Sequence, residues 1–158
     1  MNDAIKEDLR SIFRDNLAPD LLERFITLLE SIEVENEDPR QRLWVRTRKP
    51  DDRPPLDISK RNPTYFTFVR GLQRPKPRAI FGGGIERRPD STRPPAAAVN
   101  VRYSNPFVRT VENINRDLVF PFQKDNRNPR RMCVVISEDT VGILRDLLQS
   151  EVLSFLSR

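Results

Sequence analysis

The chain has 158 residues, with no histidine, one cysteine and a net charge of +5. Without His there can be no Ser-His-Asp or Cys-His catalytic site, histidine general base or His-based zinc site, and one Cys excludes a cysteine-cluster metal site and an internal disulfide. No apolar run approaches the length of about 18 residues that a membrane-spanning helix needs. We therefore expect a non-enzymatic protein with no cofactor, no metal and no membrane contact, in a reducing intracellular compartment (cytoplasm or nucleus), or in a virion if it is viral.

Charge is distributed unevenly along the chain. Residues 1–38 carry 4 basic and 11 acidic side chains (net −7), residues 39–131 carry 22 and 8 (net +14), and residues 132–158 carry 2 and 4 (net −2). The basic block also holds 13 of the 14 prolines, the only Trp and both Tyr. Because cations neutralise phosphates and flat rings stack on bases, this block predicts a polyanionic partner. The alternative is a basic sheet neutralised by the chain's own acidic helices or by a neighbouring subunit.

Two amphipathic helices are predicted in the acidic N-terminal block. Apolar residues recur at helical spacing over residues 3–16, where Asn2 or Asp3 can cap the first turn. Pro19 suits the start of a second helix that ends near Ile32. The second helix is apolar over more than half of its circumference, so we expect a helical hairpin packed on the sheet or on a second subunit.

Residues 41–48 predict a strand by strict alternation of side chains. One face would carry Leu43, Val45 and Thr47, and the other Arg42, Trp44, Arg46 and Arg48. An indole in a row of guanidinium groups predicts a stacking platform for bases. The alternative is that the arginine stems simply cover a half-buried Trp44 by packing and cation–π contact.

Further strands alternate with loops through the basic block. Residues 49–63 predict an extended Pro-rich loop, and residues 64–70 a central strand whose rings belong to the core. Residues 78–81 predict a short strand leading into three glycines at residues 82–84. We expect a hairpin tip there; the alternative is a phosphate-cradling loop, although the glycines match no nucleotide-binding pattern. Arg87 and Arg88 would then follow the tip and touch a partner.

The end of the basic block is predicted to be extended chain and loop. Residues 99–103 and 118–122 predict strands, and Pro106 marks a bend or a sheet edge before residues 107–111. Residues 126–131 predict a basic loop.

The C-terminal block predicts a buried strand followed by a helix. Residues 132–136 are apolar, and Ser137 can cap a helix that runs to Phe155. The apolar face of this helix would carry Val141, Leu144, Leu148, Val152 and Phe155.

The run CVVISEDTVGILRDLL, residues 133–148, resembles the closing strand and helix of the positive-cofactor family of single-stranded-DNA-binding transcriptional coactivators. Val141 stands where that family usually has an aromatic residue. The resemblance implies a curved antiparallel sheet that holds single-stranded nucleic acid, in a dimer packed through such helices. It covers 16 of 158 residues and assigns no functional residue here.

Together these patterns predict an α+β fold with an N-terminal helical hairpin, a mostly antiparallel sheet with long Pro- and Arg-rich loops, and a C-terminal helix. Residues 1–38 would form the acidic helical hairpin and residues 39–158 the basic β-rich region closed by the C-terminal helix, together as one compact unit.

The predicted function is non-enzymatic binding of single-stranded DNA or RNA, or genome packaging, through an arginine and aromatic surface. Arg outnumbers Lys by 23 to 5, and the guanidinium fork grips phosphate and stacks on rings. The alternative function is a structural subunit of a virion or ribonucleoprotein particle whose loops clamp neighbouring subunits, with self-association through the N-terminal and C-terminal helices. The predicted nucleic-acid contacts are Arg42, Trp44, Arg46, Arg48, Arg87, Arg88, Arg102, Arg127, Arg130 and Arg131.

Overall fold

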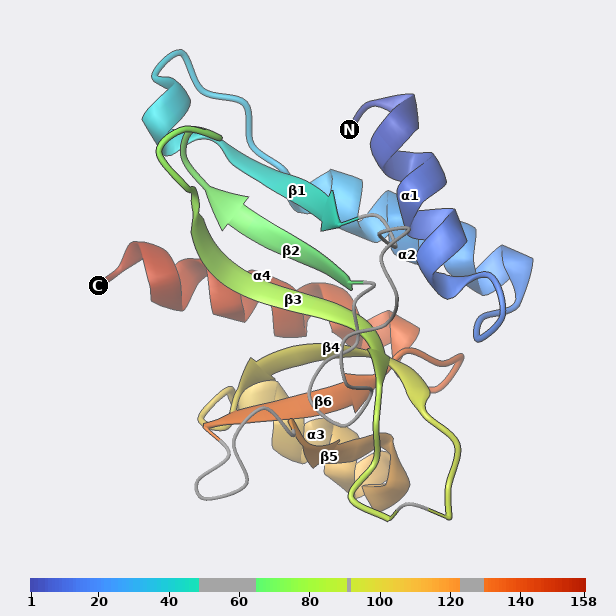
Figure 1. The fold of residues 1–158 in the computed structure, drawn as a ribbon. Helices are drawn as coiled ribbons and strands as arrows, with labels where there is room; N and C mark the ends of the chain where they lie inside the picture. The colour runs from blue at the N-terminus through green and yellow to red at the C-terminus, as the bar shows by residue number, and fades with distance from the viewer. Residues whose placement is uncertain (49–64, 91, 123–129) are drawn as a thin grey trace.

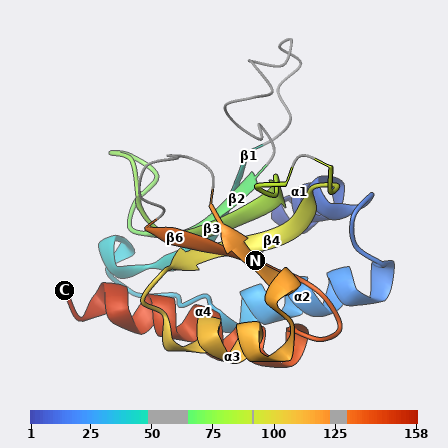
Figure 2. The ribbon, with the colours of Figure 1, turned by 90° about the horizontal axis from the view of Figure 1, so that it is seen from below.

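The computed structural model of the chain describes residues 1–48, 65–90, 92–122 and 130–158. In this part of the chain, helices cover one face of a six-stranded antiparallel sheet whose strand order is β1-β2-β3-β4-β6-β5 (Figures 1 and 2). The α+β fold class is therefore confirmed. The loop predicted at residues 49–63 lies outside the described residues.

The elements have the following bounds. The strands are β1 (Leu43–Arg48), β2 (Tyr65–Arg70), β3 (Arg78–Glu86), β4 (Ala96–Arg102), β5 (Val119–Pro121) and β6 (Arg131–Val135). The helices are α1 (Asp3–Phe13), α2 (Pro19–Ile32), α3 (Pro106–Ile114) and α4 (Val141–Leu156), with two short 3₁₀ turns, η1 (Pro39–Gln41) and η2 (Arg116–Leu118).

The N-terminal helices pack on the chain's own sheet. Asn2 caps α1 by accepting a hydrogen bond from the Ile5 N–H, and Pro19 begins α2 as predicted. The rings of Phe13, Phe25 and Phe66 then meet edge to face, with centroids 5.7 to 6.1 Å apart. Such pairs stabilise beyond the area that they bury. This aromatic cluster joins the hairpin to β2 at the centre of the core.

The glycine run lies inside a strand, and the predicted hairpin tip at residues 82–84 is wrong. β3 is the longest strand, with 9 residues, and it pairs with β2 and β4 through the three glycines. A Cβ atom on Gly83 would lie 2.5 Å from the Ala98 carbonyl oxygen and 2.8 Å from Cε1 of Phe66. Glycine is needed because the Phe66 ring rests directly on the strand.

Two helix starts differ from the predictions. Pro106 begins α3, with Asn105 as the cap accepting from the Phe107 N–H at 3.0 Å, so residues 107–111 are helical rather than extended. α4 begins at Val141, three residues later than a Ser137 cap implies. The buried Thr140 hydroxyl holds the intervening turn, because it donates to the Val135 carbonyl at 2.6 Å and accepts from the Ser137 N–H at 2.9 Å.

Both sheet edges offer little free backbone. At the β1 edge, Val34 forms an antiparallel bridge with Leu43, and the Glu33 carboxylate accepts from the Val45 N–H at 3.0 Å. The other edge strand, β5, has 3 residues and ends in Pro121. Short edge strands, proline and charged groups on edge N–H groups all disfavour pairing with another sheet.

Candidate nucleic-acid interface

Five neighbouring strands bring an arginine to the same end of the sheet, which we call the arginine end. Since the strands are antiparallel, these residues alternate between strand starts and strand ends. They are Arg42 just before β1, Arg70 at the end of β2, Arg78 at the start of β3, Arg102 at the end of β4 and Arg131 at the start of β6. Neighbouring strands lie about 4.8 Å apart, so the row extends over about 19 Å. It occupies the left side of Figure 1, where the C-terminus also lies.

The arginine end holds two pairs of directly opposed cations. Arg70 is opposite Arg78, and Arg102 is opposite Arg131. Like charges at opposed positions destabilise a sheet unless other groups compensate them. Arg78 lies over the Phe155 ring at 5.0 Å, and Arg70 donates to the Gln41 side chain. Neither of these two partners is a carboxylate, so both charges remain.

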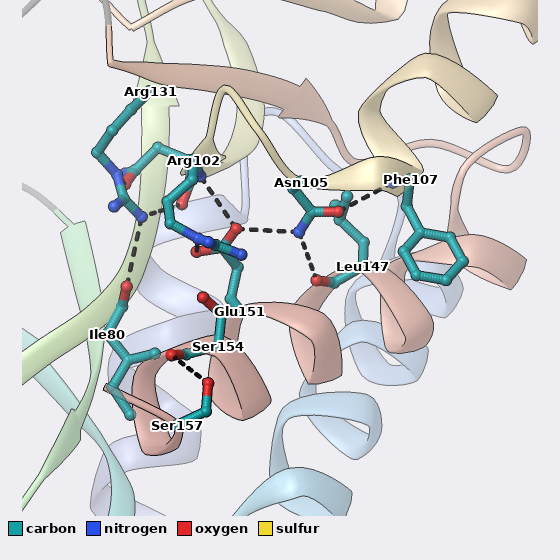
Figure 3. A network of polar contacts seen from close by, with 10 residues as sticks. Ile80, Arg102, Asn105, Phe107, Arg131, Leu147, Glu151, Ser154 and Ser157 are labelled. Carbon is teal, nitrogen blue, oxygen red and sulfur yellow. Dashed lines mark hydrogen bonds and ion pairs between the residues drawn. The ribbon is translucent and has the colours of Figure 1, made fainter.

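Arg102 and Arg131 have separate anchors (Figure 3). The Arg102 Nε donates to the buried Glu151 carboxylate at 3.2 Å. Arg131 donates to the side chain and the carbonyl of Asn100, both at 2.9 Å, and reaches the Ile80 carbonyl at 3.4 Å. Burial lowers the pKa of the Arg131 guanidinium from its ordinary value; the Glu151 carboxylate opposes this shift, and the charges of Arg102 and Arg158 add to it. These three arginines therefore lie within electrostatic reach of one another, with one carboxylate among them.

Tyr103 presents its ring at this end of the sheet. It directly follows Arg102 and is 68% exposed. Among the described residues, it is the one aromatic residue in the set of exposed large hydrophobic side chains. Its N–H donates to the Arg130 carbonyl at 2.9 Å, which places the exposed Arg130 beside it. An exposed ring among cations can stack on a base while the cations meet phosphates.

Tyr103 was missed by the sequence analysis, which assigned it to a strand. The signal that could have found it is the run Tyr103-Ser104-Asn105-Pro106, because Asn before Pro is a turn and helix-start pattern. A ring in this turn lies beyond the end of the strand, whereas a ring within the strand would point to one of the two faces of the sheet.

Trp44 lies inside the protein, so the alternative in which arginine covers the indole describes it better than a stacking platform. Its side chain is 8% exposed, and its Nε1 donates to the Gly71 carbonyl at 2.8 Å. The Arg42 guanidinium lies over the ring at 5.0 Å and 3.8 Å from the Glu35 carboxylate. Arg42 and Trp44 thus both have their partners within the chain.

The other predicted contacts are dispersed. Arg46 is half-buried opposite Thr67 in the middle of β1, and Arg48 ends β1 at the far end of the sheet. The side chain of Arg48 and all of Arg127 lie outside the described part of the structure. The structure therefore brings Arg102, Arg130 and Arg131 together, with Arg42 along the same end of the sheet.

Arg87 and Arg88 follow β3 and lie away from the arginine end. Arg87 is exposed, whereas Arg88 donates to the Asp117 carbonyl at 2.7 Å and lies over the Phe120 ring at 5.0 Å. Arg93 pairs with the Asp117 carboxylate at 3.2 Å. These groups hold the chain between β3 and β4 against η2.

A cavity of about 290 Å³ lies at the β1 corner of the arginine end. Its lining includes Trp44, Leu72 and the Glu33 carboxylate. Glu33 Oε1 is buried and forms an ion pair with the Met1 ammonium at 3.1 Å. A buried carboxylate disfavours a polyanion, so the cavity itself is a poor site for nucleic acid.

The sheet face opposite the helices carries a second, small apolar cluster. Ala98, Phe120 and Cys133 are buried there. Burial raises the pKa of Glu86 from its ordinary value of 4.5 to about 7, and it raises the pKa of the Cys133 thiol. A protonated thiol is a poor nucleophile, so the geometry gives Cys133 no chemical role.

The described residues contain no group of three or more acidic or Cys side chains able to hold a metal ion. No helix in the same part of the chain is long and apolar enough to cross a membrane. Comparison of the chain with protein-family models, with curated proteins and with solved structures found no match.

Proposed function

We propose that this protein binds single-stranded nucleic acid without catalysing a reaction, and that the arginine end and Tyr103 form the contact surface. The observation that carries the proposal is the exposed Tyr103 ring beside Arg102, Arg130 and Arg131. One unpaired base would stack on the ring while flanking phosphates meet the guanidinium groups. A ring that stacks in this way requires an unpaired base, which favours a single strand over a duplex.

Two features of the surface support this proposal over a neutralised basic sheet. The acidic helices pair largely among themselves, as Arg10 does with Glu23 at 2.7 Å and Lys6 with Glu30 at 3.2 Å. At the arginine end, the buried Glu151 is paired with Arg102, while Arg130 and Arg158 are exposed. The excess positive charge thus remains where the aromatic ring is exposed.

The test is a fluorescence anisotropy titration with labelled single-stranded and duplex oligonucleotides at several salt concentrations. The single strands should bind more tightly, and Tyr103→Ala should weaken their binding by about 1 to 3 kcal/mol while leaving the salt slope nearly unchanged. Tyr103→Phe keeps the ring and should keep the affinity. Ile114→Ala, at a 47% exposed position at the end of α3, is the surface control. Equal affinity of wild type and Tyr103→Ala would overturn this site.

A second candidate function, a structural subunit of a larger assembly, is favoured by the last turns of α4. Leu153 and Leu156 are 59% and 43% exposed there, whereas in the described residues one sheet edge is partly covered and the other is short. Self-association would then use the helices rather than strand pairing. Light scattering of the wild type and of Leu153→Ser tests it, because a wild type that stays monomeric at high concentration removes this candidate.

A further inference from the structure

The turn that presents Tyr103 is held at both ends by one buried carboxylate. The Asn105 N–H donates to the Arg102 carbonyl at 3.0 Å, which closes a four-residue turn with Tyr103 and Ser104 in the middle. Glu151 Oε1, from α4, accepts from the Arg102 N–H at 3.0 Å and from Asn105 Nδ2 at 2.9 Å. Figure 3 shows the Glu151 side chain reaching from α4 to both residues. We call residues 102–105 the Tyr103 turn.

The same network fixes the turn to the helices that follow. Asn105 Nδ2 also donates to the Leu147 carbonyl at 2.9 Å, while Asn105 Oδ1 caps α3. Asn105 and Glu151 are each 2% exposed, so neither group exchanges its partners with water. Buried polar networks with all their members paired hold one conformation.

A carboxylate at this position is costly for stability alone. A buried ion pair rarely stabilises more than apolar residues of the same shape would, and this helix face is otherwise lined by Leu147, Leu148 and Val152. Its negative charge also opposes binding of a polyanion nearby. Neither packing nor surface charge favours Glu151 at this position. A role in holding the Tyr103 turn gives a reason for its presence.

We infer that Glu151 is a positioning residue for nucleic-acid binding: its carboxylate holds the Tyr103 turn so that the ring is ready to stack on a base. The inference rests on the function proposed above. A ring held in place before binding loses less conformational entropy when the base arrives. Glu151 touches no ligand itself and acts through Arg102 and Asn105.

Two substitutions of Glu151 separate this role from a charge effect. Glu151→Gln removes the charge but keeps an oxygen able to accept from both ends of the turn, whereas Glu151→Leu removes the charge and the oxygen. A pure charge effect makes both variants bind an oligonucleotide more tightly than wild type. Positioning predicts that Glu151→Gln binds the oligonucleotide as tightly as wild type or more tightly. Glu151→Leu should bind it about 3- to 30-fold more weakly. This loss is part of the roughly 5- to 150-fold in affinity that one stacked base contributes.

A double-substitution cycle shows whether Glu151 acts through Tyr103. In the Tyr103→Ala background the ring is absent, so adding Glu151→Leu should change affinity by less than about 2-fold. The readout is anisotropy with a labelled single strand, on variants whose circular dichroism matches wild type. If Glu151→Leu does not fold, Asn105→Ser keeps a capping hydroxyl but loses the bond to Glu151, and it should give the same weakening.

The possible failures are distinguishable. If Tyr103→Ala binds as wild type, the proposed contact surface is overturned. If Tyr103→Ala weakens binding but folded Glu151→Leu or Asn105→Ser binds as tightly as Glu151→Gln, only the positioning role is overturned. The same conclusion follows if Glu151→Leu weakens binding equally with and without the Tyr103 ring.

Discussion

Arg102 and Arg131 are directly opposed on the antiparallel strands β4 and β6. Each guanidinium is held by groups of its own, Glu151 for Arg102 and Asn100 with the Ile80 carbonyl for Arg131. These anchors therefore keep the two guanidinium groups from moving apart. Glu151 offsets one of these two charges, so one net positive charge remains at this site, and a preorganised site loses little entropy when a ligand binds.

The arginine end should make binding steeply dependent on salt. For a single strand, each neutralised phosphate contributes about 0.7 to the slope of log affinity against log salt concentration. Arg130→Ala should therefore lower the slope by about 0.7 and weaken binding to all sequences alike. Arg145→Ala removes an exposed charge from the first half of α4 and should leave the slope unchanged. A flat salt response of the wild type would contradict a phosphate-binding surface.

Trp44 should contribute to stability and not to binding. Trp44→Phe keeps a ring but removes the hydrogen bond from Nε1 to the Gly71 carbonyl, and it leaves a half-buried acceptor without this donor. We expect a loss of about 1 to 3 kcal/mol in the free energy of unfolding, measured by urea denaturation. Oligonucleotide affinity should stay within about 2-fold of wild type. A large loss of affinity in a folded Trp44→Phe protein would instead place the indole at the interface.

Gly83 should not tolerate a side chain. In Gly83→Ala the new methyl group would meet the Ala98 carbonyl oxygen at 2.5 Å and the Phe66 ring at 2.8 Å, and neither can retreat within the packed sheet. Overpacking of this kind costs about 1 to 3 kcal/mol or more. Gly142→Ala is the control, since a Cβ there meets nothing within 4 Å and α4 should gain up to about 1 kcal/mol. Thermal melts of the two variants should shift in opposite directions.

Glu86 should make stability fall as pH rises. Its pKa in the folded protein is about 7 against an ordinary value of 4.5, so the folded state binds the proton more tightly than the unfolded state does. The stabilisation is complete below about pH 4.5 and is lost as pH rises through about 7. Glu86→Gln removes the ionisation, so it should raise the free energy of unfolding by roughly 1 to 3 kcal/mol at pH 8 relative to its effect at pH 4.5. Parallel pH profiles for both proteins would contradict this.

Local pattern accounts for most of the elements. Helical spacing with Pro19 located α2 and its end at Ile32, and alternation located β1 with Leu43 and Val45 in the core. The errors arose where local signals had two meanings. Glycines at residues 82–84 signal a turn or a close packing contact, and only the Phe66 ring, from another strand, decides between them. In the same way Asn105-Pro106 fits either a bend or a helix start.

The amino-acid sequence by itself determined how charge is distributed along this protein: a basic, arginine-rich block lies between acidic ends, with no histidine and a single cysteine. Composition and charge are properties of the residues, so they do not depend on how the chain folds. Only the tertiary structure decided which of those groups meet. Antiparallel pairing brings Arg102 to Arg131 across 29 residues of sequence, burial removes Trp44, and Glu151 reaches from α4 to fix the turn of Tyr103. Register and packing depend on partners distant in the sequence, and no local pattern contains them.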